Sequence, residues 1–179
     1  MPHSLKAALD VQYKEPGPSA TAACVLFEHW NDAEPVAEHR THIPKVADYQ
    51  PGQFYKRELP CLLAALDETN ARLSVVLIDG HVWLERDDQP GLGAHLYEAL
   101  ERKIPVIGVA KSAFRGSTHA RQVFRGQSQK PLFVTSVGID LNQAAEHVAS
   151  MAGEYRIPTL LKRVDALARK RWVEVAVAR

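Results

Sequence analysis

The stretch Ser74-Val-Val-Leu-Ile-Asp79-Gly80-His81 decides how the fold of this 179-residue chain is interpreted. Residues 74–78 are small or apolar and include β-branched side chains, which is typical of a short strand buried on both faces. Asp79 then places a carboxylate at the carboxyl end of that strand, and Gly80 allows the backbone to turn. Because ligands of open α/β sheets bind at this edge, we expect Asp79 to be a site residue. A simple Asp-Gly turn is the alternative interpretation.

The composition, with 46% hydrophobic and 24% charged residues, is that of an ordinary globular protein, and the length predicts one domain over 1–179. No apolar run approaches the roughly 20 residues of a membrane helix. The N-terminus lacks a basic segment followed by a long apolar core. We therefore expect a cytoplasmic monomer without a membrane partner. Cys24 and Cys61 show no metal-binding spacing and are predicted to be free core thiols.

The pattern along the chain predicts an α/β fold. We expect strands over 5–13, 20–29, 35–43, 74–78, 104–110 and 132–138, the first three forming a meander. We expect helices over 59–66, 91–102 and 140–152, and in the first half of 164–177. The strand-helix-strand unit from Asp79 to Lys111 implies parallel pairing, so that both residues would lie at one edge of the sheet.

Three further features point to chemistry at that edge. Asp10 lies in the middle of a predicted strand, where a buried carboxylate requires a paired charge or a metal. Glu58 directly precedes a predicted helix start. The segment 111–130 contains five basic residues and no acid, which suits a phosphate-bearing partner. Exposure of Asp10, simple helix capping by Glu58 and a solvated basic loop are the alternatives.

The segment 49–58 reads Tyr-Gln-Pro-Gly-Gln-Phe-Tyr-Lys-Arg-Glu. Its Pro-Gly pair predicts a turn. Its aromatic side chains, which lie beside two cations, could stack on bases and contact phosphates. A loop held to the core by its aromatic residues would explain the same pattern.

Four motifs together resemble the endonuclease V family in order and spacing. They are Ala8-Leu9-Asp10-Val11-Gln12-Tyr13, the segment 49–58, Ile78-Asp79-Gly80-His81 and Ile107-Gly108-Val109-Ala110-Lys111. Arg156-Ile157-Pro158 followed by Asp165 is similar to the C-terminal element of that family, so the resemblance covers nearly the whole chain.

The resemblance implies a ribonuclease H-like mixed sheet, a three-stranded antiparallel meander plus parallel strands, flanked by helices. It implies an endonuclease that needs Mg²⁺ or Mn²⁺ and cuts inosine-containing DNA or RNA at the second phosphodiester on the 3′ side of the base. Matching by position assigns metal binding and catalysis to Asp10, Glu58, Asp79 and Asp165, with Lys111 as the active-site lysine. Matching also assigns nucleic-acid binding to Tyr49 as a wedge between bases, and to Pro51, Gly52, Arg57, Gly80, His81 and Arg115.

The sequence also departs from the family pattern after Asp79. A glycine and a basic His-Pro-Arg triplet usually follow the Asp-Gly-His motif, whereas this chain reads Val82-Trp-Leu-Glu-Arg-Asp-Asp88. The three acids of this link, Glu85, Asp87 and Asp88, would repel phosphate at close range, so we expect weaker discrimination for inosine than the family shows. A nucleic-acid-binding module that keeps the fold without turnover is the main competing hypothesis. The retained acids argue against it, because pure binding does not need carboxylates beside phosphates.

Overall fold

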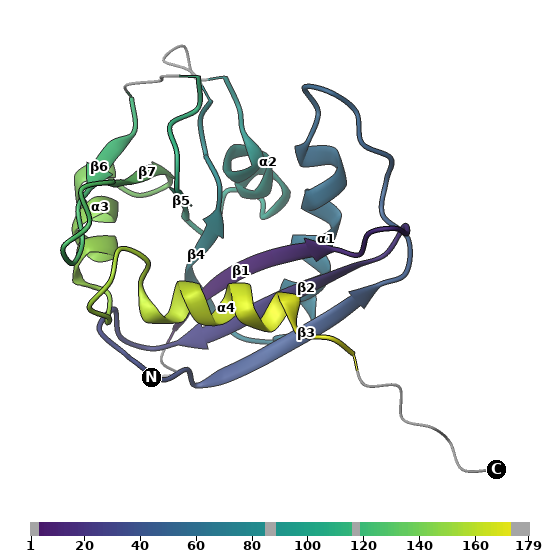
Figure 1. Cartoon of the computed structure of the whole chain (residues 1–179), viewed down its shortest axis with the longest axis horizontal. Coiled ribbons are helices and arrows are strands. Elements are labelled where there is room, and N and C mark those ends of the chain that lie inside the picture. Colours follow the sequence, from purple (N-terminus) through teal and green to yellow (C-terminus); the bar gives the residue numbers. More distant parts are fainter. Residues whose placement is uncertain (1–3, 85–88, 116–118, 173–179) are drawn as a thin grey trace.

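The computed structural model describes residues 4–84, 89–115 and 119–172. It contains a seven-stranded sheet in the order β3-β2-β1-β4-β5-β7-β6 (Figure 1). The strands are β1 (Leu5–Tyr13), β2 (Ala20–Phe27), β3 (Ala37–Ile43), β4 (Leu73–Asp79), β5 (Val106–Ala110), β6 (Arg121–Val123) and β7 (Leu132–Val137). The helices are α1 (Tyr55–Asp67), α2 (Leu92–Ala99), α3 (Leu141–Ser150) and α4 (Thr159–Arg169).

The centre of the sheet is parallel and its two sides are antiparallel. Strand β1 pairs in parallel with β4, and β4 with β5. The meander β1-β2-β3 lies on one side, and β7 and β6 extend the other side in antiparallel pairing. This arrangement confirms the predicted ribonuclease H-like mixed sheet. The short strand β6 was not expected, because three residues carry no readable alternation.

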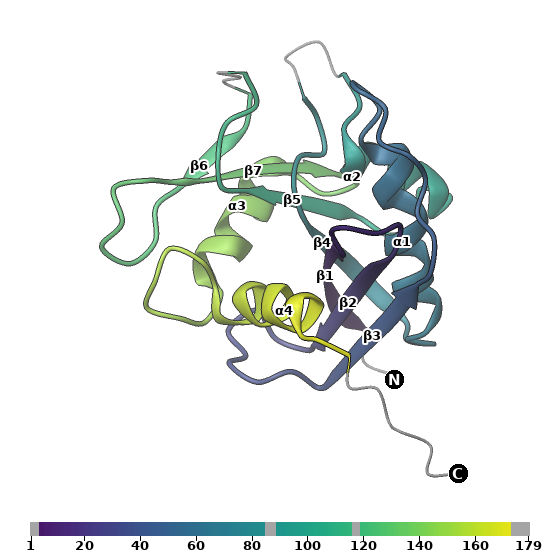
Figure 2. The same cartoon turned by 45° about the vertical axis from the view of Figure 1, so that its right-hand side comes forward.

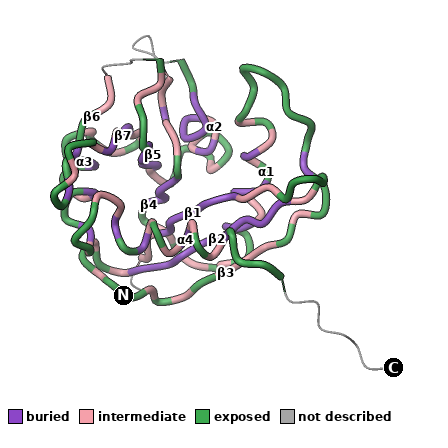
Figure 3. Tube along the Cα trace, in the orientation of Figure 1, coloured by how far each residue is buried: buried purple, intermediate pink, exposed green. Residues whose placement is uncertain are grey.

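Helices cover both faces of the sheet (Figures 1 and 2). Helices α1 and α2 contribute to one buried cluster, which includes Leu62 and Leu96, and α3 and α4 contribute to the other, which includes Val148 and Leu160. Strands β2 and β5 are accordingly buried along their whole length and β1 and β4 in their middle, whereas exposed residues gather on loops and outer helix faces (Figure 3). Apolar side chains on both faces of one strand explain the continuous run at 75–78.

Two helix starts differ from the expectation. Helix α1 begins at Tyr55, before Glu58, because the carbonyl groups of Gln53 and Phe54 already accept the N–H groups of residues 56 and 57 at 3.1 Å. Helix α4 begins at Thr159, directly after Pro158, whose fixed φ suits the start of a helix. The interpretation that Asp165 opens the last segment was wrong, because Asp165 lies inside α4.

Both cysteines are buried and free, as predicted. The helices in the described part of the chain are too short or too polar to cross a membrane.

Arg125 lies in the basic segment 111–130 but is an internal residue, with 6% of its surface exposed. Its guanidinium donates hydrogen bonds to backbone carbonyl groups of the loop between α3 and α4. The acceptors are Met151, Ala152, Gly153, Tyr155 and Arg156. Burial lowers the pKa of Arg125. The interpretation of the whole segment as a phosphate-binding surface is therefore wrong at this position.

Replacing Arg125 by Met should lower the free energy of unfolding by about 2–3 kcal/mol, because hydrogen bonds from a charged donor contribute about 1.5–3 kcal/mol and buried carbonyl groups would lose their partner. Urea unfolding followed by circular dichroism measures this loss. The control is Arg121→Met, which changes an exposed arginine of β6 and should alter stability by no more than about 0.5 kcal/mol. Equal effects of the two changes would contradict the role of Arg125.

Candidate active site

The pairing of β1 with β4 brings two carboxylates to one edge of the sheet. Leu9 pairs with Ile78, and the next residue on each strand is an aspartate, Asp10 or Asp79. Asp10 is 5% exposed, whereas the Asp79 side chain is 46% exposed because β4 ends there. Gly80 follows with φ +142°, which confirms the sharp change of direction expected after the strand.

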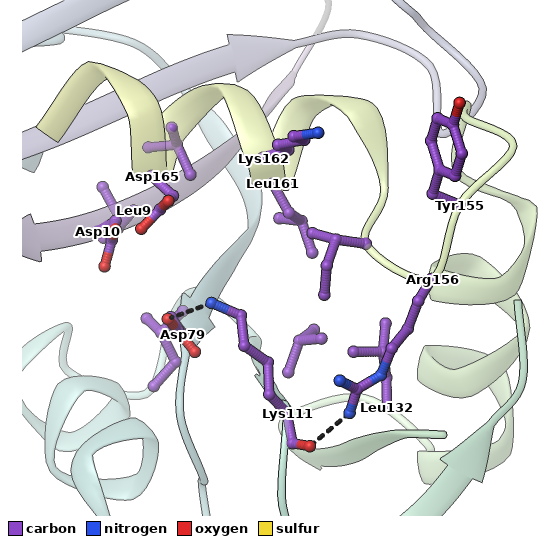
Figure 4. A pocket seen from close by; sticks show the side chains of 14 residues that line it. Leu9, Asp10, Asp79, Lys111, Leu132, Tyr155, Arg156, Leu161, Lys162 and Asp165 are labelled. Carbon is purple, nitrogen blue, oxygen red and sulfur yellow. Dashed lines mark hydrogen bonds and ion pairs between the residues drawn. The ribbon is translucent and has the colours of Figure 1, made fainter. Parts of the chain in front are cut away.

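Both aspartates face a cavity of about 310 Å³ that lies under α4 (Figure 4). Lys111 enters its wall from the end of β5, and Asp165 enters from α4. Much of the remaining wall is apolar and comes from Leu9, Ile78, Val109, Leu132, Ile157, Leu161 and Val164. Four of the five residues expected to act in catalysis therefore share one cavity.

Asp10 is a buried acid with one unused oxygen. Its Oδ1 accepts the backbone N–H of Val11 at 2.9 Å, but its buried Oδ2 has no hydrogen-bond partner among the described residues. Burial, followed by the charge of Asp79 and by the hydrogen bond that a protonated carboxyl group can share with Asp165, raises the pKa of Asp10 to about 7. Desolvation and like charge both disfavour the ionised form. Within the described ranges, no lysine or arginine forms an ion pair with this carboxylate, although a buried charge requires a compensating cation.

Glu58 reaches the same group of acids from α1, on the opposite face of the sheet from α4. It is 7% exposed and is absent from the cavity wall that contains Asp10. Burial raises the pKa of Glu58 to about 8, and the charges of Asp10 and Asp79 add to the effect. The charge of Arg57 opposes the rise only in part.

Two of the acids have cationic partners. Lys111 Nζ lies 3.6 Å from Asp79 Oδ2, and Arg169 Nε lies 3.0 Å from Asp165 Oδ1 (Figure 4 shows the first pair). The expectation that Lys111 and Asp79 share one edge of the sheet is confirmed by this contact. Lys111 is half exposed, so it can leave Asp79 for a phosphate oxygen at little cost.

Arg156 is a residue of this region that we did not include in the predicted site. Its Nη2 donates to the carbonyl oxygen of Lys111 and, at 2.7 Å, to that of Pro131. These bonds join the loop before α4 to the end of β5 and so fix the backbone that carries Lys111. The Arg-Ile-Pro motif was visible in the sequence, but only the structure shows what its arginine contacts.

The donor set suits a hard divalent cation such as Mg²⁺ or Mn²⁺, which prefers carboxylate oxygens. Asp10 supplies a buried oxygen without a partner, and Asp79 lies beside it at the open edge. As the side chains stand, no three His, Cys, Asp or Glu residues within the described ranges come together closely enough to enclose a metal ion. The chemistry of the acids therefore fits a metal, although they do not form a closed set of ligands.

The residues expected to form the wedge lie just before α1. Tyr49 is 60% exposed and makes a T-shaped contact with Phe54, with ring centroids 6.5 Å apart. Pro51 and Gly52 form the predicted turn, in which Gly52 has φ +75°. Arg57 instead lies with its guanidinium 4.0 Å from the Tyr13 ring centroid, next to Glu58.

The other expected nucleic-acid contacts lie after β4 and β5. His81 Nε2 lies 3.1 Å from the Ser112 carbonyl oxygen, so this nitrogen carries the proton, and its buried Nδ1 has no described partner. Burial lowers the pKa of His81. Arg115 is exposed and stacks near Phe114, 5.2 Å from the ring centroid. Glu85, Asp87 and Asp88 lie outside the described residues, so the expected effect of this acidic link stays a prediction.

Comparison with known proteins relates this geometry to one family. Residues 2–130 match the family model of Endonuclease V. Endonuclease V of Streptomyces avermitilis is 32% identical over 184 residues, which cover 90% of this chain and 78% of that protein. The crystal structure of Endonuclease V from the same organism has a TM-score of 0.75 at 29% identity, covering 94% of this chain and 81% of that one.

A more distant structure shows the same fold. It is Ciona intestinalis Endonuclease V in complex with a 24mer DNA that contains an inosine followed by a ribo-adenosine. Its TM-score is 0.78 at 21% identity, with 93% of this chain and 84% of that chain covered. The matched family model spans the motifs around Asp10, Glu58, Asp79 and Lys111, which lie together in the structure. This chain therefore belongs to the endonuclease V family.

Proposed function

We propose that this chain is a metal-dependent endonuclease that hydrolyses a phosphodiester bond on the 3′ side of inosine in DNA or RNA. The observation that carries the proposal is the buried Asp10 carboxylate, which has an unpartnered oxygen beside the open Asp79 and Lys111. A buried carboxylate without a cationic partner destabilises the fold, and such groups are common at sites that bind a cation or catalyse a reaction. Membership of the family and the inosine-containing DNA bound by the Ciona relative support the choice of substrate.

Each residue has a role that follows from its surroundings. Asp10 and Asp79 would hold Mg²⁺ or Mn²⁺, with Glu58 or Asp165 completing the site directly or through water. A bound metal would activate water and stabilise the leaving oxygen. Lys111 would leave Asp79 and contact a non-bridging oxygen of the scissile phosphate, where it stabilises developing negative charge.

The remaining residues would position the substrate. The exposed ring of Tyr49 lies on a loop outside the sheet and can enter a duplex to separate stacked bases. Arg156 would keep Lys111 at a constant distance from the acids, because it holds the backbone carbonyl of that residue.

Asp79→Asn should abolish cleavage and leave the fold intact, because the change is nearly isosteric and removes a metal-binding charge. The assay uses labelled single- and double-stranded oligonucleotides containing inosine, uracil or a mismatch, in Mg²⁺ and in Mn²⁺. Asp67→Asn, an exposed acid at the end of α1, is the matched control and should cleave like the wild type. Cleavage by Asp79→Asn at the wild-type rate, or no cleavage of any oligonucleotide by the wild type, would contradict the proposal.

Asp10 and Glu58 should lower the stability of the metal-free protein as the pH rises from about 4 to about 8. Over most of this range the folded protein keeps protons on Asp10 and Glu58, whose pKa values are about 7 and about 8, whereas the unfolded chain loses them near the ordinary values of 3.8 and 4.5. Because the folded state then binds more protons, the free energy of unfolding decreases with pH. Urea unfolding in EDTA at several pH values measures this slope.

Glu58→Gln should flatten that slope, so its stability relative to the wild type should increase with pH. Glu154→Gln changes an exposed acid and should leave the slope as it is. If Mg²⁺ occupies the site, adding it at pH 8 should stabilise the wild type more than Glu58→Gln. A slope that is the same in both variants would show that Glu58 does not carry the titration.

Tyr49→Ala should weaken binding to inosine-containing duplexes more than to single strands of the same sequence. A wedge is needed only where stacked bases must separate, and stacking of a base on an aromatic ring contributes about 1–3 kcal/mol. Fluorescence anisotropy titrations compare the two substrates, and Tyr49→Phe should retain most of the affinity. Equal losses on duplex and single strand would assign Tyr49 a role in the loop itself.

A further inference from the structure

The end of the cavity away from the acids contains a second group of polar side chains. Tyr155, Arg156 and Lys162 form this part of the wall, together with the stem of Lys111 (Figure 4). Apolar side chains, among them Leu132, Ile157 and Leu161, also line this cavity. The reaction proposed above uses the acidic end and Lys111, and it gives no role to Tyr155 or Lys162.

Tyr155 combines a fixed backbone with an open ring. Arg125 Nη1 donates to its carbonyl oxygen at 3.0 Å, and the backbone of Gly126 packs against residues 154 and 155. The residue is nevertheless 72% exposed, which makes it the most exposed large hydrophobic residue in the described part of the chain. An exposed aromatic ring on a backbone held by hydrogen bonds is suited to stacking, because little backbone freedom is lost when a partner binds.

Lys162 gives this ring a cationic neighbour. Its Nζ lies 5.9 Å from the ring centroid of Tyr155, and both side chains line the cavity. Lys162 projects from the first turn of α4, and its side chain is exposed to solvent. A nucleic-acid base can stack on such an aromatic ring, and the neighbouring lysine can form an ion pair with a phosphate group.

The charge at this end of the cavity suits an anion. Arg156 and Lys162 carry positive charge, and Asp165, the nearest acid of the cavity wall along α4, is paired with Arg169 at 3.0 Å. Glu154 is next to Tyr155 in the chain, but it is exposed and absent from the wall. The cavity has acids at one end, a tyrosine with basic side chains at the other, and apolar lining residues as well. A nucleotide fits such a cavity better than a wholly charged or a wholly apolar ligand does.

The two loops that flank the site indicate the direction in which a bound nucleic-acid strand would run. The loop before α1, which contains Tyr49, and the loop before α4, which contains Tyr155, lie on opposite sides of the β1–β4 edge in both views (Figures 1 and 2). If inosine is held on the Tyr49 side and the cut falls on its 3′ side, the strand that continues past Asp79 toward Tyr155 is the 3′ product.

We propose that Tyr155 and Lys162 form a subsite for the first nucleotide beyond the cleaved bond, with its base stacked on the Tyr155 ring and its 3′ phosphate paired with Lys162. The inference rests on the proposed function, because the direction of the strand depends on it. The subsite would hold the leaving part of the strand in line with the reacting phosphate. The ligand is single-stranded at this point, since a paired base could not lie flat on the ring.

Fluorescence of 2-aminopurine tests the stacking directly. An inosine-containing single strand carries 2-aminopurine as the first nucleotide beyond the cleaved bond, and Ca²⁺ replaces Mg²⁺ to keep that bond intact. Binding to the wild type should quench the fluorescence, Tyr155→Phe should preserve the quenching, and Tyr155→Ala should remove it. The dissociation constant of Tyr155→Ala should rise about 5- to 100-fold, as for the loss of one base–aromatic stack.

The matched control is Phe124→Ala, which removes another exposed aromatic ring, 60% exposed, that does not line the cavity. It should leave both quenching and affinity unchanged. Lys162→Gln should keep the quenching but reduce the slope of log affinity against log salt by about 0.7, the value for one phosphate contact to a single strand. Urea midpoints of all variants should match the wild type, because the changed side chains are exposed.

The outcomes distinguish failure of the subsite from failure of the proposed function. Cleavage of inosine-containing strands together with unquenched fluorescence in the wild type, or quenching that survives Tyr155→Ala, would overturn the subsite alone. If Phe124→Ala loses as much quenching and affinity as Tyr155→Ala, the subsite is overturned as well, because the effect is then not specific to the cavity. Absence of both binding and cleavage would overturn the proposed function and the subsite with it.

Discussion

The constraint on which this structure depends is the placement of a carboxylate, Asp10, inside a strand that is buried on both faces. Its Oδ2 has no described partner, and Asp79 lies at the adjacent position on β4. The packing of β1 between β2 and β4 holds both groups in place, so their mutual repulsion cannot be relieved by moving apart. A fold that keeps such an arrangement tolerates a destabilising charge, which is a common feature of functional sites.

Electrostatic strain is distributed unevenly over the four acids. Asp79 and Asp165 have cationic neighbours in Lys111 and Arg169, whereas burial raises the pKa of Asp10 and of Glu58. The two paired acids are also the more exposed ones, and surface pairs exchange partners at little cost. The proposed site thus combines buried acids that would attract a cation with open ion pairs that would rearrange around a phosphate.

Two arginines that do not belong to the acid cluster determine the shape of the site. Arg125 binds the carbonyl groups of the loop before α4, and Arg156 ties the same loop to the end of β5. Through these bonds the loop that carries Tyr155 and the strand that carries Lys111 form one unit. The same few hydrogen bonds therefore stabilise the loop and, in the proposed function, position the substrate, so a change in the loop should alter both stability and substrate binding.

The sequence by itself determined most of the strands and helices, because strand patterns and the Asp-Gly turn depend on local chemistry and on burial. The mixed sheet and the four candidate acids followed from those patterns together with the resemblance to a family. Only the tertiary structure decided that α1 begins before Glu58, that Asp165 lies within α4 and that Arg125 is internal rather than a phosphate ligand. It also decided that Arg57 packs on Tyr13 and that Tyr155 joins the cavity. A charged or aromatic side chain has the same local pattern whether it meets solvent, a carbonyl group or a ligand, so its partner is set by contacts between segments that are distant in the chain.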